Sequence, residues 1–324
     1  MSILTLMINI LIFPGGLFAI MLGLFLSGVD RKVYARLQRR VGPPIYQPGI
    51  DVIKLWQKET VIPRTASMFA FRAAPLVGFA GMFAAVALIP VTGIYSGLSQ
   101  SGDLIVLLYL LSTPALALMI GASASGSPYG SVGLSREMTM VLAYEVPLLV
   151  VFLTVGMRVG MANGDFASFS MSSIVNYQLS NGNLLSDLRM LPAFLALLCC
   201  IPGTIGVVPF DLPEAETELA EGPLLEYSGA GLAVFKITGS LKILVMSALT
   251  VALFFPSGIG SFWLLNLVWF IFKCLVVSFF SITLVRATRA RMRLDQAYKF
   301  FLIYPTSLAL ISLVLTLLTF RVQV

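Results

Sequence analysis

Long apolar runs alternate with short polar stretches along almost the whole chain. A helix needs about 20 apolar residues to cross the hydrocarbon core of a bilayer, and about eight runs approach that length. Helices are expected because lipid offers the backbone no hydrogen-bond partners. The predicted membrane-spanning segments are approximately 3–29, 69–92, 104–121, 138–157, 191–208, 232–255, 262–285 and 300–320. The pattern therefore predicts an all-α polytopic membrane protein with about eight transmembrane helices.

Composition supports the same class. Hydrophobic residues make up 58% of the sequence and charged residues 11%, whereas a soluble domain carries about 25% charged residues. This excludes a water-soluble globular protein. No internal repeat or low-complexity segment divides the chain, so we expect a single integral membrane domain over residues 1–324.

The basic residues between the apolar runs predict the orientation of the chain in a membrane. They gather in segments 30–68 and 286–299, and positively charged loops remain on the cytoplasmic side. We therefore expect cytoplasmic loops at about 30–68, 122–137, 209–231 and 286–299, with both termini outside a cell membrane. The net charge of +6 follows from this bias, and we expect no nucleic-acid partner.

The first of these loops, residues 30–68, has a structured pattern. Residues 30–40 continue the first span as a basic helix, which Gly42, Pro43 and Pro44 end. Residues 51–59 have the pattern of an amphipathic helix lying at the membrane surface. Membrane anchoring and docking of a soluble partner are both consistent with this pattern. The candidate docking residues are Arg31, Lys32, Arg36, Arg39, Arg40, Lys54 and Lys58.

An acidic segment, residues 209–229, lies between two apolar runs and contains no Lys or Arg. Its acids are Asp211, Glu214, Glu216, Glu218, Glu221 and Glu226. We expect a short helix here with Asp211 as N-cap and Glu214 completing a capping box. Mutual repulsion and partial burial should raise some carboxylate pKa values toward neutral pH, where these groups can exchange protons. The alternative is a solvated acidic loop.

Three charged residues fall inside predicted spans: Glu145, Lys242 and Lys273. Such groups cost several kcal/mol in lipid unless they are paired or hydrated. Glu137 precedes Glu145 by two turns on the same helix face. Together with the acidic segment, these residues predict a polar ion or proton path. For Lys242 the alternative is a side chain that extends to the membrane surface, and for Glu137 a local surface pair with Arg136.

A metal site within the chain is not expected. The sequence contains no His and only three Cys, namely Cys199, Cys200 and Cys274. His is the commonest metal ligand, and zinc and iron–sulfur sites use clustered Cys. We therefore predict that this chain carries no metal and no cofactor of its own.

Three motifs follow one another along the chain: DRKVYARLQRRVGPP with QPGIDVIKLWQKE, then SREMTMVLAYEVP, then PFDLPEAETEL with EYSG. Together they resemble the quinone-chamber subunit of proton-pumping NADH dehydrogenase (complex I). The resemblance covers nearly the whole chain. The version EGPLLEYSGAG is most similar to the homologous subunit of energy-converting membrane-bound [NiFe] hydrogenases, including formate hydrogenlyase and archaeal ferredoxin-linked relatives.

The resemblance implies a non-catalytic membrane subunit of a respiratory oxidoreductase complex. Such a subunit docks the soluble redox arm and couples ferredoxin-driven electron transfer to H⁺ or Na⁺ translocation. Glu145 matches a buried glutamate of the family's hydrophilic axis, and the acidic segment matches its entrance. The implied partners are hydrogenase large and small subunits, an iron–sulfur subunit and antiporter-like membrane subunits, with the [NiFe] and iron–sulfur centres on those partners.

Two residue patterns depart from complex I and leave other functions open. Glu221 replaces a small or apolar residue, and the segment 42–48 is shorter than the one that helps to line the quinone cavity. These departures favour the hydrogenase type. The alternatives are a quinone-chamber subunit of a complex I-like NADH or ferredoxin dehydrogenase and a sulfur-reducing relative of the hydrogenase. A stand-alone transporter would be expected to show an inverted repeat, which is not found. A passive anchor would leave the buried charges without a role.

Overall fold

The computed structural model describes residues 11–13, 15–95, 97, 104–260 and 262–323. Within them the chain is helical, with one isolated bridge between Val91 and Tyr95. Its longer helices are α2 (Gly16–Leu37), α3 (Gln47–Trp56), α4 (Met68–Leu88), α5 (Leu104–Ser125), α6 (Pro128–Asn163), α7 (Met171–Asn181), α8 (Leu191–Ile205), α10 (Gly229–Phe254), α11 (Trp263–Ser278) and α13 (Leu294–Gln323). A π-helical turn, η3 (Phe279–Thr283), joins α11 to the short α12 (Leu284–Thr288).

The prediction of an all-α polytopic membrane protein is confirmed. Six helices of the described chain are long and apolar enough to cross a membrane: α4, α5, α6, α10, the continuous α11–η3–α12 and α13. The fifth predicted span corresponds to α8, a shorter apolar helix of 15 residues. The first predicted span begins among residues 1–10, outside the described residues, and its described part is α2.

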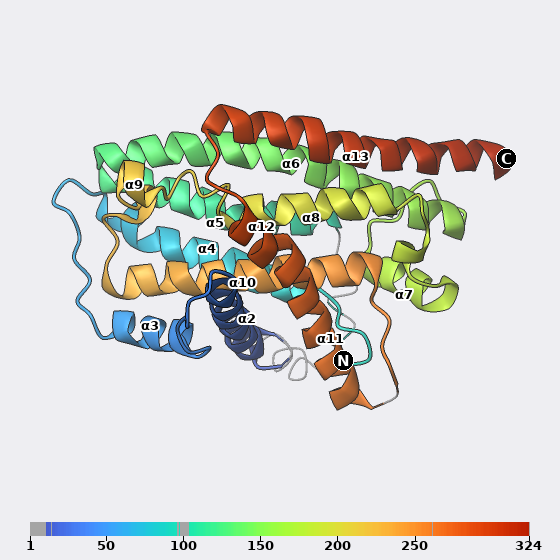
Figure 1. Ribbon diagram of the computed structural model, residues 1–324, viewed down its shortest axis with the longest axis horizontal. Helices are drawn as coiled ribbons and strands as arrows, with labels where there is room; N and C mark the ends of the chain where they lie inside the picture. The colour runs from blue at the N-terminus through green and yellow to red at the C-terminus, as the bar shows by residue number, and fades with distance from the viewer. Residues whose placement is uncertain (1–10, 14, 96, 98–103, 261, 324) are drawn as a thin grey trace.

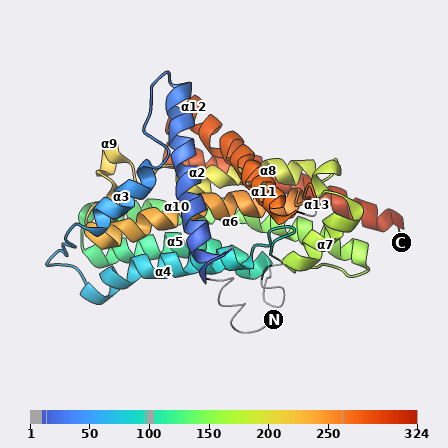
Figure 2. The ribbon, with the colours of Figure 1, turned by 90° about the horizontal axis from the view of Figure 1, so that it is seen from below.

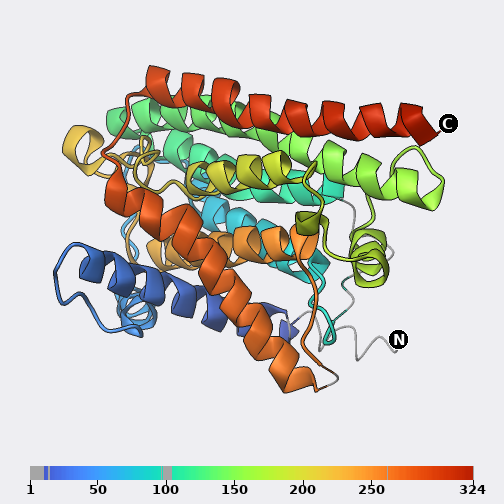
Figure 3. The ribbon, with the colours of Figure 1, turned by 45° about the vertical axis from the view of Figure 1, so that its right-hand side comes forward.

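Helix α10 forms the centre of the bundle. Its most apolar stretch is 89% buried, because α2, α3, α4, α8 and α11 all pack against it. The helices α4, α5, α6, α8 and α13 run alongside α10 (Figure 1). In contrast, α2 is seen almost end-on in Figure 1 and upright in Figure 2, so it crosses α10 at a steep angle. Helix α11 is also inclined to the bundle (Figure 3).

Two glycines allow α2 to make its close contacts. A Cβ atom at Gly23 would lie 2.8 Å from the carbonyl oxygen of Ser240 on α10. A Cβ atom at Gly28 would lie 1.9 Å from the carbonyl oxygen of Ile45, in the segment that leads into α3. Any larger side chain at either position would therefore displace backbone. These contacts place α2 and α3 on the same side of α10.

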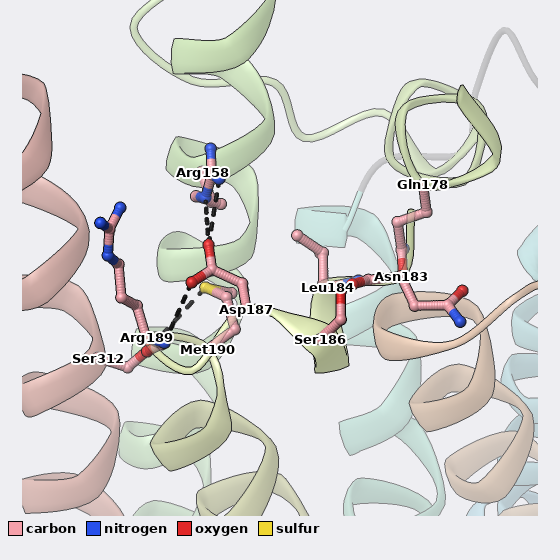
Figure 4. A network of polar contacts seen from close by, with 9 residues as sticks. All are labelled: Arg158, Gln178, Asn183, Leu184, Ser186, Asp187, Arg189, Met190 and Ser312. Carbon is pink, nitrogen blue, oxygen red and sulfur yellow. Dashed lines mark hydrogen bonds and ion pairs between the residues drawn. The ribbon is translucent and has the colours of Figure 1, made fainter. Parts of the chain in front are cut away.

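The end of the bundle remote from the acidic segment is closed by a polar network (Figure 4). Arg158 of α6 donates to the carboxylate of Asp187 at 3.1 Å, and the same carboxylate accepts the Arg189 N–H at 3.2 Å. The Ser312 hydroxyl of α13 donates to the Arg189 carbonyl at 2.8 Å. The network therefore joins α6, α13 and the start of α8.

The C-terminal end of α10 is capped by two buried side chains. Gln178 of α7, which is 3% exposed, donates to two carbonyl groups in the last turn of α10 at 3.1 and 3.0 Å. Lys273 of α11 donates to the carbonyls of Phe255 and Ser257 at 2.6 and 2.5 Å. The last carbonyls of a helix lack partners within the helix and carry partial negative charge, so an amide and an ammonium group stabilise this end.

Two segments expected as loops are shorter than the sequence suggested. Within residues 122–137, only Gly126 and Ser127 separate α5 from α6, because Pro128 starts the next helix and the polar residues that follow continue it. Within residues 286–299, only 289–293 separate α12 from α13. Glu137 therefore lies on a helix.

Candidate functional site

A cavity of about 410 Å³ lies between α2, α3, α10 and the acidic segment. We call it the charged cavity, because its lining includes Arg31, Asp51, Asp211, Glu214, Glu221, Lys236 and Arg286. Gly239 of α10 also lines it, and a Cβ atom there would meet nothing within 4 Å. Charges of both signs thus surround a space at one end of the membrane-spanning bundle.

The acidic segment does not form the predicted capped helix. Its only α-helix in the described chain is the single turn α9 (Glu216–Leu219), whose N-cap is Ala215 with no side-chain cap bond. Residues 220, 221 and 222 then have φ values of 48°, 74° and 50°, which end the turn. The prediction that Asp211 is an N-cap is wrong, because its carboxylate is engaged by a distant arginine. The prediction that Glu214, Glu218 and Glu221 share one helix face is wrong for the same local reason.

Two arginines hold the acidic segment against the bundle. Arg291, between α12 and α13, lies 2.8 Å from the carboxylate of Asp211. Arg136 of α6 lies 2.6 Å from the carboxylate of Glu218 and also donates to the Leu212 carbonyl at 3.4 Å. The hydrogen bond from Arg136 lowers the pKa of Glu218. Glu218 therefore stays ionised and acts as an anchor.

Glu214 is partly buried in the wall of the charged cavity. Burial, followed by the negative charges of Asp211, Glu137 and Glu221, raises the pKa of Glu214 to about 7, although the ammonium of Lys242 opposes the shift. A carboxylate with this pKa can take up and release a proton near neutral pH. The acidic segment, α6 and α10 each contribute a charge that acts on Glu214.

Glu145 lies farther along α6, about 12 Å from Glu137 at 1.5 Å per residue. Its carboxylate accepts a hydrogen bond from the hydroxyl of Ser112 on α5. It lines a second space of about 540 Å³ between α5 and α6, which we call the lateral cavity. The other walls of the lateral cavity are mainly apolar: Leu108, Leu116, Met119, Ile120, Met138, Val141 and Leu142. The structure thus separates Glu145 from the charged cavity.

Tyr144 is a residue that the sequence analysis missed. It is 4% exposed, and its phenol is within electrostatic range of the carboxylates of Glu137 and Glu145. Its position next to Glu145 on a helix that carries two acids was the available signal. The phenol provides a polar group between the two carboxylates.

Asp30 and Arg286 were not predicted as site residues. Asp30 is 6% exposed and accepts a 2.6 Å hydrogen bond from Thr283 and a 3.3 Å contact from Arg286. The guanidinium of Arg286 also lies over the ring of Tyr34, 4.4 Å from its centroid. This cluster joins α2 to the π-helical turn and places a compensated positive charge in the cavity wall. An isolated Asp after an apolar run was the only signal in the sequence.

The structure does not bring every predicted path residue together. Lys273 lies 5.6 Å from the ring centroid of Phe255 and 5.7 Å from that of Trp269, at the α10 end described above, remote from the acidic segment. Its ammonium has carbonyl partners there. Glu226 is partly buried, with no ion pair to a described residue, and for Glu216 only the backbone of α9 is described.

The predicted docking residues lie on α2, α3 and their connections. Arg31 lies 3.3 Å from Asp51 of α3, and the Gln47 amide donates to the same carboxylate at 2.8 Å. This pair ties α2 to α3. Lys32 is partly buried, whereas the remaining predicted docking residues are exposed: Arg36, Arg39, Arg40, Lys54 and Lys58.

Among the described residues, no group of three His, Cys, Asp or Glu side chains is placed to hold a metal ion. Cys200 and Cys274 are buried and Cys199 is partly buried, all as free thiols. The chemistry supported by the site is therefore charge compensation and proton exchange by carboxylates.

Comparison with known proteins gives consistent relatives. The family model described as NADH dehydrogenase matches residues 8–317. Formate hydrogenlyase subunit 4 of Escherichia coli (strain K12) is 38% identical over 278 residues, which cover 83% of this chain and 86% of the relative. Hydrogenase-4 component C of the same organism is 36% identical over 74% of this chain and 73% of its own length. A membrane subunit of NADH-quinone oxidoreductase from Syntrophotalea carbinolica is 33% identical over 84% and 83%, respectively.

A solved structure resembles the whole fold. It is that of the membrane-bound sulfane sulfur reductase (MBS), an archaeal respiratory membrane complex. The matching chain is 28% identical, with a TM-score of 0.85 and coverage of 97% of this chain and 98% of its own.

Proposed function

Because the chain belongs to the NADH dehydrogenase family and is similar to a membrane subunit of complex I, we propose that it joins a soluble redox arm to ion-translocating membrane subunits. The parent assembly would be a complex I-related, energy-converting [NiFe] hydrogenase complex driven by ferredoxin. Two relatives with hydrogenase names, each matched over more than 70% of this chain, support that choice. The observation that carries the proposal is Glu214, a carboxylate with a pKa of about 7 in the charged cavity.

The basic residues would dock the soluble arm. Arg36, Arg39 and Arg40 are exposed at the end of α2, beside the charged cavity. Charged rims of this kind guide association and make it sensitive to salt. The docked partners would be the hydrogenase large and small subunits and the iron–sulfur subunit, which would hold the [NiFe] and iron–sulfur centres.

The acids would couple the redox reaction to ion movement. A change of charge at the docked arm would shift the protonation of Glu214, which interacts electrostatically with Glu137 and Lys242. Glu137 and Glu145 lie on the same helix, and Glu145 opens into the lateral cavity. Electrostatic coupling is strong where water is scarce, so charge can be passed along this row without a cofactor. An antiporter-like subunit would adjoin the lateral cavity and receive H⁺ or Na⁺.

The orientation follows from the same proposal. The charged cavity and the basic residues would face the cytoplasm, because the basic residues gather at that end. With eight spans, both termini would lie outside.

A second candidate differs in the electron acceptor, which would be a quinone or a sulfur compound. The volume of the charged cavity, about 410 Å³, falls within the usual range for small-molecule sites, about 300–1,000 Å³. The similarity to a chain of a sulfane sulfur reductase complex favours the sulfur compound. The many charged groups in the cavity wall argue against an apolar quinone head.

Purification of the native complex through a tag on this chain tests the assignment. The proposal predicts hydrogenase large and small subunits, antiporter-like subunits, nickel and iron in the complex, and no metal on the separated chain. A complex without nickel that still oxidises ferredoxin would favour the second candidate. Recovery of the chain alone, or with stoichiometric metal bound to it, would contradict both.

A further inference from the structure

A third cavity, of about 370 Å³, lies on another face of α10. It is bounded by the end of α3, the first half of α4 and the start of α10, and we call it the aromatic cavity. Its lining includes Trp56, Phe71, Arg72, Pro75, Leu76 and Tyr227. We propose that the aromatic cavity binds an anionic phospholipid, with the headgroup phosphate on Arg72 and an acyl chain along the apolar wall.

Arg72 is the charged member of this lining. It lies in the second turn of α4, a helix long and apolar enough to cross a membrane, and its side chain is exposed. No carboxylate of the described residues forms an ion pair with it. A cation near the end of a spanning helix costs free energy unless an anion or water compensates it. The phosphate layer of an anionic bilayer supplies that anion at this depth.

The aromatic wall of the cavity has its hydrogen bond within the chain. The Tyr227 hydroxyl donates to the Phe71 carbonyl at 3.0 Å, and the two rings stack with centroids 4.1 Å apart. Leu76 and Trp56 are 61% and 60% exposed. An acyl chain would cover both, and Trp is favoured where hydrocarbon meets headgroups. The combination of one cation and a long apolar wall matches the two ends of a phospholipid.

The aromatic cavity is distinct from the charged cavity. Ala230, Gly231 and Val234 of α10 face the aromatic cavity, whereas Phe235 and Lys236 face the charged one. A bound lipid would therefore support α10 from the side opposite to the acids. The inference does not depend on which redox partner the chain serves.

Native mass spectrometry of the full-length chain in detergent tests the proposal. We expect phosphatidylglycerol to remain bound in preference to phosphatidylcholine, and Arg72→Gln to weaken its binding about fivefold, the usual effect of one basic residue at a membrane surface. Arg72→Lys should retain binding because it keeps the charge. Arg64→Gln is the matched control, since Arg64 is exposed in the same connection but lines no described cavity. Equal binding of both lipids to the parent, or equal loss in the Arg64 and Arg72 variants, would overturn the proposal.

Fluorescence gives an independent readout that remains available if Arg72→Gln fails to fold. Brominated phosphatidylglycerol should quench the Trp56 emission, defined as the difference between the parent and Trp56→Phe, more than brominated phosphatidylcholine does. The same difference should persist in the intact complex. Loss of quenching in the complex would mean that a helix of a neighbouring subunit occupies the cavity. Displacement of the lipid by millimolar inorganic phosphate would identify a free-anion site. Either result would contradict the lipid proposal.

Discussion

Arg291 and Asp211 are 80 residues apart in the sequence, yet a guanidinium nitrogen of one lies 2.8 Å from a carboxylate oxygen of the other. Their side chains are 25% and 20% exposed, so the pair is largely shielded from water. Through it, the loop before α13 holds the start of the acidic segment. The conformation of the charged cavity therefore depends on a contact between two distant parts of the chain.

Removing that contact should loosen the acidic segment. We expect Arg291→Gln to destabilise the protein by about 2 kcal/mol, because a partly buried carboxylate loses a charged hydrogen-bond donor. Limited proteolysis should cut the variant faster within residues 211–222. Arg289→Gln is the control, because Arg289 is exposed in the same loop. Equal cleavage rates in both variants would mean that the pair does not hold the segment.

Glu214 should make stability depend on pH. Its pKa of about 7 lies above the ordinary value of 4.5, so the folded protein binds this proton more tightly than the unfolded chain does. The resulting stabilisation is complete below about pH 4.5 and is lost as the pH rises through 7. Allowing for the partial exposure of the group, the change is about 2 kcal/mol.

The check is thermal unfolding of the parent and of Glu214→Gln between pH 5 and 8, in otherwise identical buffer. The parent should lose stability across this range more steeply than the variant. Glu218→Gln serves as control, because Arg136 lowers the pKa of Glu218 and moves its titration below this window. Parallel pH profiles for parent and Glu214→Gln would exclude a neutral-range titration at Glu214.

The exposed basic residues should matter for assembly more than for folding. Reversing Arg36, Arg39 and Arg40 to Glu should release the soluble subunits at lower salt, because interfacial charge pairs contribute about a few kcal/mol to association. Co-purification of the soluble subunits across a salt series measures this. Arg189→Glu, an exposed arginine at the other end of the bundle, should have no effect. Retention of the full set of subunits by the triple variant in high salt would exclude docking at these residues.

The sequence predicted the helices well because lipid leaves an apolar chain few alternatives. It could not predict the acidic segment, whose partners Arg136 and Arg291 lie 82 and 80 residues from the acids they bind. Local rules favoured a capped helix starting at Asp211, and the distant arginines override them. The raised pKa of Glu214 was predicted in direction from crowding of acids, while its cause, burial between the acidic segment, α6 and α10, required the fold.

Buried charges were located by sequence but not interpreted correctly by it. Lys273 was expected on a polar path, whereas its ammonium caps α10 through the carbonyls of Phe255 and Ser257. Asp30 was given no role, because its contact with Arg286 spans 256 residues of sequence. A hydropathy pattern identifies charges inside membrane segments, and only the packing of helices identifies their partners.

Glu145→Gln should impair ion translocation while leaving the complex assembled. Gln retains the size of Glu and can still accept the hydrogen bond from Ser112, but it cannot ionise. Burying a neutral amide costs less than burying a carboxylate, so stability should not fall. Asp165→Asn is the control for loss of one carboxylate, because Asp165 is exposed and lies beyond the end of α6.

The most direct test of the coupling proposal is the number of ions taken up per electron transferred, measured together in sealed vesicles that contain the purified complex. The account predicts that Glu145→Gln and Glu214→Gln each lower this ratio strongly or abolish both activities, with the subunit composition unchanged, while Asp165→Asn keeps the parental ratio. An unchanged ratio in both the Glu145 and Glu214 variants, with normal electron transfer, would contradict it.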